Sequence, residues 1–122
     1  MIGYTTLGTN RMPEALAFYD ALFALRGASR LMELDTFVLY GASMEEPCVA
    51  VVRPYDGNDA SVGNGVMVAL RTDSQDEVGA LYTKALELGG SDEGEPGPRG
   101  DGFYAAYFRD LDGNKFCTFC LG

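Results

Sequence analysis

The chain has 122 residues, of which 47% are hydrophobic and 22% charged, a size and composition typical of one compact globular domain. Its 18 acidic and nine basic residues give a formal net charge of −9, which argues against binding to nucleic acid or to an anionic membrane surface. The sequence contains no histidine, so the commonest metal ligand and the usual general base near neutral pH are both missing.

The first half of the chain shows one helical pattern among several short apolar runs. Thr9 or Asn10 is a suitable N-terminal cap for the helix, and Gly27 is expected to end it. In chain order, the predicted elements cover residues 2–7 (strand), 12–25 (helix), 28–34, 36–40 and 48–53 (strands).

The same order begins again after the loop PYDGNDASVGNG. The predicted elements here cover residues 66–71 (strand), 74–88 (helix), 103–109 and 115–121 (strands). Ser74 is expected to cap the second helix and Gly89 to close it, while the glycine- and proline-rich stretch EPGPRGDG is predicted to be a loop.

A shift of 63 positions aligns the two halves, with identical residues at seven paired positions: Leu7 and Leu70, Thr9 and Thr72, Glu14 and Glu77, Ala17 and Ala80, Tyr19 and Tyr82, Leu25 and Leu88, and Gly27 and Gly90. The shared order of elements indicates two copies of a β-α-β-β-β module, at about residues 1–57 and 64–122. We expect both modules to belong to a single domain covering residues 1–122.

Two of the three cysteines, Cys117 and Cys120, lie three residues apart on the last predicted strand. Side chains at that spacing point to opposite faces of a strand, so both thiols cannot enter one metal site. Cys120 shares its face with Phe116 and Thr118 and is interpreted as core filling, whereas Cys117 is the better candidate for a cavity wall. Three cysteines and no export signal favour free thiols and a cytoplasmic location.

Three motifs in this order, TLGTNRMPEALAFYDALFALRG, GNGVMVAL and YAAYFRDLDGNKFC, resemble the vicinal oxygen chelate superfamily. That superfamily includes glyoxalase I, extradiol dioxygenases and bleomycin-resistance proteins. The resemblance covers nearly the whole chain and implies an α+β fold, in which two βαβββ modules form a glyoxalase-like domain with a curved mixed sheet. It also implies a homodimer, but not one particular reaction.

In metal-dependent members of the superfamily, ligands come from the first and last strands of each module and are typically His, Gln and Glu. The resemblance places Tyr4 and Met67 at the first-strand positions, and Cys117 at the position of the final-strand glutamate. The last strand of the first module, CVAVVRP, has no acid or amide. We therefore expect no metal and no other cofactor, and metal-dependent lyase or dioxygenase activity is disfavoured.

If the superfamily's register holds, the concave surface carries a ligand-binding site whose residues are Tyr4, Thr6, Met67, Tyr104 and Cys117. An apolar wall of this kind suits a small organic molecule, and the acidic chain would attract a cationic one. The alternative is that Met67 and the tyrosines fill a closed core.

Three functions follow from these expectations. The first is a metal-free protein of the bleomycin-resistance type that sequesters a small cationic or aromatic molecule. The second is a glyoxalase- or dioxygenase-like metalloenzyme with non-standard ligands. The third is a degenerate module that acts through protein contacts. The empty ligand positions favour the first of these.

Overall fold

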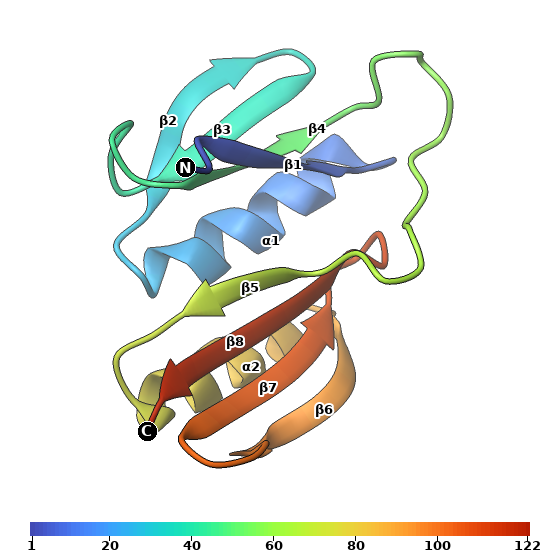
Figure 1. Ribbon diagram of the computed structural model, residues 1–122. Helices are drawn as coiled ribbons and strands as arrows, with labels where there is room; N and C mark the ends of the chain where they lie inside the picture. The colour runs from blue at the N-terminus through green and yellow to red at the C-terminus, as the bar shows by residue number, and fades with distance from the viewer. The chain divides into compact units, whose positions relative to one another are not determined.

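A computed structural model describes all residues, 1–122, and divides them into two compact units, Met1–Val62 and Gly63–Gly122. Each unit has one helix and one four-stranded sheet (Figure 1). The first unit contains β1 (Tyr4–Gly8), α1 (Met12–Ala24), β2 (Ser29–Leu34), β3 (Phe37–Gly41) and β4 (Cys48–Val52). The second contains β5 (Val68–Arg71), α2 (Gln75–Glu87), β6 (Ser91–Pro98), β7 (Phe103–Arg109) and β8 (Lys115–Leu121).

The two sheets have the same topology. The strand order is β1-β4-β3-β2 in the first unit and β5-β8-β7-β6 in the second. In each unit the first strand pairs in parallel with the last, and the other neighbours are antiparallel. The helices occupy residues 12–24 and 75–87, which correspond at the predicted shift of 63 positions. The predicted α+β fold with a repeated βαβββ pattern is therefore confirmed.

Both helices are 13 residues long, and neither is long and apolar enough to cross a membrane. The predicted cap of α2 is confirmed, because Ser74 Oγ accepts a hydrogen bond of 3.1 Å from the backbone N–H of Glu77. The predicted N-cap of α1, Thr9 or Asn10, is wrong. Arg11 is the N-cap residue and has no side-chain cap, while the amide of Asn10 instead holds Ala60 through hydrogen bonds of 2.6 and 3.2 Å.

β6 corrects a second prediction, since EPGPRGDG was expected to be a loop. The first four of these residues, EPGP, belong to the strand that pairs with β7. β6 lies at the edge of its sheet, where proline is tolerated because one side of the strand needs no backbone partner. Register shifts around Gly94 interrupt the pairing and account for the weak strand pattern of this segment.

Each helix covers one face of its own sheet. In the first unit, Tyr40 of β3 packs against Tyr19 and Phe23 of α1, with ring centroids 6.2 and 5.5 Å apart. In the second, the Tyr82 hydroxyl of α2 donates a hydrogen bond of 2.9 Å to Asp92 of β6. Period-two alternation leaves the opposite face of each sheet turned away from its helix.

Candidate functional site

Tyr4 and Thr6 lie together on the face of the first sheet that is turned away from α1. Tyr4 pairs with Cys48 and Thr6 with Ala50, whereas Leu7 pairs with Val51 on the helix-facing side. Tyr4 and Thr6 therefore point to the same face of the sheet, as the alternation along the strand predicts, and both side chains are exposed. This face is the first candidate binding surface.

A groove of about 560 Å³ lies on this first unit, within the size range of pockets that bind small organic molecules. Its lining residues are Thr6, Gly8, Thr36, Phe37, Val52, Arg53, Pro54 and Tyr55. The Tyr4 ring, 55% exposed, meets the ring of Phe37 edge-on at 5.7 Å between centroids. Phe37 and Tyr55 are therefore the two aromatic residues that line the groove, while Tyr4 is not a lining residue and reaches it only through its contact with Phe37.

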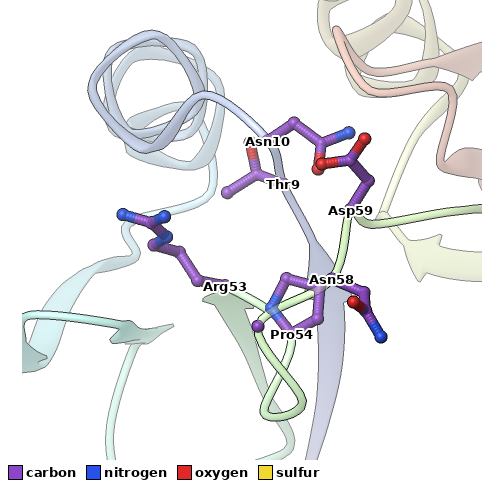
Figure 2. Close-up of a pocket in the computed structure, with 7 residues that line it drawn as sticks. Thr9, Asn10, Arg53, Pro54, Asn58 and Asp59 are labelled. Carbon is purple, nitrogen blue, oxygen red and sulfur yellow. The ribbon is translucent and has the colours of Figure 1, made fainter.

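A second pocket of the same unit is much smaller, about 90 Å³, and mainly polar. Figure 2 shows Thr9 and Asn10, which precede α1, and Arg53, which follows β4, among its lining residues. The Asn10 amide already holds the backbone of Ala60. This pocket has room for a few water molecules, and its polar groups serve to fasten the loop that follows β4.

Cys117 and Met67 belong to the corresponding face of the second sheet. Cys117 pairs with Tyr107 on one side and with Ala69 on the other, and alternation puts Met67 on the same face as Ala69. Tyr104 pairs with Cys120, so it lies on the opposite face from Cys117. The structure therefore brings Met67 and Cys117 onto one face and leaves Tyr104 on the other.

The Cys117 thiol is 1% exposed and stands beside Tyr107. Burial raises the pKa of the thiol, against the opposing effects of the Tyr107 hydroxyl and the positive charges of Arg99 and Lys115. Burial likewise raises the pKa of Tyr107. A thiol that stays protonated near neutral pH is a poor nucleophile and a poor metal ligand.

The residues at the superfamily's ligand positions do not suit a divalent metal. Tyr4 and Met67 are unusual ligands, and the Cys48 thiol already donates to the carbonyl oxygens of Ser43 and Glu46, at 3.4 and 3.1 Å. No group of three or more His, Cys, Asp or Glu side chains is arranged to hold a metal ion. No catalytic step through a metal is therefore derived for this chain.

Met67 gives a direct test of the closed-core alternative, because its side chain is 42% exposed just before β5. We expect Met67→Glu to change the free energy of unfolding by less than about 0.5 kcal/mol, as at other surface positions. The melting temperature should then stay within roughly 3 °C of the wild-type value. A thermal unfolding curve shifted down by several times that amount would show that the side chain is enclosed.

Several residues near the candidate sites were not singled out from the sequence. Phe37 and Val52, a register pair beside Thr6, line the groove, and Tyr107 stands beside Cys117. Alternation along a single strand identifies which residues share a face but not which strand lies next to it. These residues become recognisable only when the strand order and register are known.

Comparison with known proteins gives one family. The family model of the Glyoxalase/Bleomycin resistance protein/Dioxygenase superfamily matches residues 1–118. No curated protein matches the chain in sequence.

Solved structures show the same fold. A glyoxalase/bleomycin resistance protein from Albidiferax ferrireducens T118 is 28% identical with a TM-score of 0.91, and the match covers 100% of this chain and 99% of that one. A hypothetical protein from S. aureus is 27% identical with a TM-score of 0.72, covering 98% and 96%. A lactoylglutathione lyase from Agrobacterium tumefaciens is 20% identical with a TM-score of 0.70, covering 98% and 92%, and supports the fold alone.

Proposed function

Because the chain belongs to the Glyoxalase/Bleomycin resistance protein/Dioxygenase superfamily, we propose that it is a metal-independent binding protein for a compact organic molecule. The observation that carries the proposal is the groove of the first unit, which combines a ligand-sized volume with an apolar and aromatic wall. Sequestration needs such a wall and no reactive group. Binding therefore requires less of this chain than catalysis does.

The side chains around the groove indicate the kind of ligand. Phe37, Val52 and Pro54 offer apolar surface, and the exposed ring of Tyr4 adds an aromatic edge beside Phe37. Thr6 and Thr36 supply a few hydroxyl groups. Arg53 lies on the same groove, so a positively charged ligand would meet a like charge there. We therefore propose a neutral ligand with aromatic or aliphatic bulk for this groove.

The chemistry of the matched ligand positions also supports binding without metal. The superfamily's usual carboxylate position is occupied by Cys117, whose pKa is raised by burial, and the chain has no histidine.

A cytoplasmic location and assembly as a homodimer belong to the same proposal. Sedimentation at several protein concentrations tests the dimer, which a concentration-independent monomer would contradict.

The proposal predicts that Thr6→Glu weakens ligand binding without unfolding the protein. Thr6 is exposed and lines the groove, so the new carboxylate would remain hydrated in the free protein but be desolvated by an apolar ligand. A screen of neutral aromatic and aliphatic compounds by thermal shift supplies the probe. We expect the affinity for each stabilising compound to fall by at least about tenfold in Thr6→Glu.

Met44→Glu is the matched control, since Met44 is 64% exposed and does not line the groove. This variant introduces the same charge and should bind each compound as the wild type does. Binding should also survive treatment with a chelator. A screen without any stabilising compound, or stoichiometric metal in protein purified without chelator, would overturn the proposal.

A further inference from the structure

The basic residues of the second unit are concentrated on one face of its sheet. This unit has five of them: Arg71, Lys84, Arg99, Arg109 and Lys115. Arg71 follows Ala69 in alternation and pairs with Phe119, while Arg109 and Lys115 pair with each other in line with Tyr107 and Cys117. Arg99 reaches the same face, with its guanidinium carbon 5.6 Å from the centre of the Tyr107 ring.

Four of the five bases thus lie on the face turned away from α2, which we call the basic face. The fifth, Lys84, is on α2 and has the Glu87 carboxylate 4.0 Å away. Four of the unit's acidic residues lie on the helix side of the sheet. Asp76, Glu77 and Glu87 belong to α2, and Asp92 of β6 accepts a hydrogen bond from the helix residue Tyr82. The basic face itself holds one paired acid, Glu93, which contacts Arg109.

Three of the cations on the basic face have no carboxylate partner. Arg109 alone forms an ion pair, with Glu93 at 3.4 Å. Arg99 donates to the backbone carbonyls of Glu95 and Pro98, and the Lys115 ammonium lies 5.6 Å from the Tyr107 ring centre. The exposed side chain of Arg71 has no polar partner. In an acidic chain, cations left without carboxylates are available to an anion from solution.

The position of Arg99 is fixed by the backbone beneath it. A Cβ atom at Gly94 would lie 2.9 Å from Cδ2 of Tyr107 and 3.3 Å from an Nη atom of Arg99. A Cβ at Gly97 would lie 3.0 Å from the other Nη atom. The two glycines of β6 therefore make the space in which the guanidinium and the ring pack together. This explains the glycines in a strand that they otherwise weaken.

Aromatic surface accompanies the charges. The rings of Phe103 and Phe119, both half-buried, stack with centroids 5.3 Å apart on the same face as Tyr107. Two arginines, a lysine and a ring platform are complementary to a flat molecule that carries an anionic group. A carboxylate fits the planar guanidinium group well, since it can accept two parallel hydrogen bonds from one arginine.

We propose that the basic face binds a small aromatic carboxylate. The Arg71 guanidinium would hold the carboxylate beside the Phe103–Phe119 stack, which would hold the ring, while Arg99 and Lys115 add positive charge around Tyr107. This proposal rests on residues of the second unit alone, and its observations are independent of those that support the proposed function. The net charge of the chain suggests a cationic ligand, but the ligand proposed for this face is anionic. At hydrogen-bonding distance, the nearby bases act on the ligand more strongly than the total charge of the chain does.

The test compares 2-naphthoate with 2-naphthamide, which has the same ring system without the charge, by NMR titration of the full chain. We expect the wild type to bind naphthoate at least about tenfold more tightly than naphthamide, as charge-assisted hydrogen bonds require. The shifted resonances should include those of Arg71, Tyr107 and Phe119. In the double variant Arg71→Gln, Lys115→Gln the ratio should fall to within about twofold.

Lys84→Gln is the matched control, since it removes one positive charge from α2 and should leave the naphthoate preference unchanged. The single variant Arg71→Gln keeps the experiment decisive if the double variant does not fold, because Arg71 is exposed and makes no polar contact. Equal affinity for the two compounds, tighter binding of 2-naphthylmethylamine, or no binding of naphthoate would each overturn the proposal. Pairing of the wild type but not of Arg71→Gln in sedimentation would assign the face to a second copy and would overturn it as well.

Discussion

Replacing Phe108 by alanine should lower the free energy of unfolding by about 3–5 kcal/mol, the range for large aromatic side chains in protein cores. Phe108 is 0% exposed and stacks on Phe116 of β8, with ring centroids 5.3 Å apart and an interplanar angle of 8°. The pair lies on the face that α2 covers. Removing one ring leaves a cavity. The atoms that line it lose their dispersion contacts with the ring, and the stabilisation from burying the apolar side chain is lost as well. Urea unfolding at neutral pH measures the loss.

Leu121→Ala is the control, because this apolar residue of the neighbouring strand is 59% exposed and should contribute less than about 0.5 kcal/mol. A cost below about 1 kcal/mol for Phe108→Ala would contradict the packing described. The same curves test the predicted single domain. If residues 1–122 form a single domain, we expect one cooperative unfolding transition in the wild type and in Phe108→Ala. Two separate transitions in the variant would indicate that the two units unfold independently.

The fold was predictable largely because local signals agree with one another. The strands at residues 103–109 and 115–121 have the predicted bounds, since alternating aromatic residues meet a DGN turn whose Asp110 side chain accepts from the backbone N–H groups of Asp112 and Asn114. β6 was missed because its apolar content is low and it contains Gly94, Pro96 and Gly97. Pairing with β7 makes it a strand, and such pairing is not visible in a local pattern.

The candidate site was less predictable, for a geometric reason. Tyr104 and Tyr107 are three residues apart on β7 and therefore point to opposite faces. The residue that faces the same way as Cys117 is decided by the register of β7 against β8, which pairs Cys117 with Tyr107. The basic face depends on the same register, and on the packing of the Arg99 side chain across Gly94 and Gly97 of β6 against the Tyr107 ring. Neither follows from residue spacing along one strand.

A polar network joins α1 to the first sheet and carries the second large effect. The Asp20 carboxylate accepts two hydrogen bonds from the Arg30 guanidinium, at 2.8 and 2.7 Å, and one of 2.7 Å from the Tyr40 hydroxyl. Hydrogen bonding from Arg30 holds the pKa of Asp20 below its usual value, although partial burial opposes this. Burial raises the pKa of Tyr40, and the hydrogen bond to Asp20 adds to the shift. The carboxylate therefore serves the fold in its charged form.

Asp20→Ala should cost about 2 kcal/mol at pH 7, because the buried Tyr40 hydroxyl loses its shortest hydrogen bond and retains only the carbonyl of Leu16 at 3.3 Å. Since the folded-state pKa of Asp20 lies below the unfolded value near 4, its contribution is present above that value and is lost as the pH falls through the folded pKa. The difference between variant and wild type should therefore shrink at acid pH, as urea unfolding at a series of pH values would measure. Glu33→Ala is the control, because Glu33 contacts the same Arg30 from a side chain that is 61% exposed and should contribute less than about 1 kcal/mol. A cost for Asp20→Ala that stays constant with pH would contradict the role of the charged carboxylate.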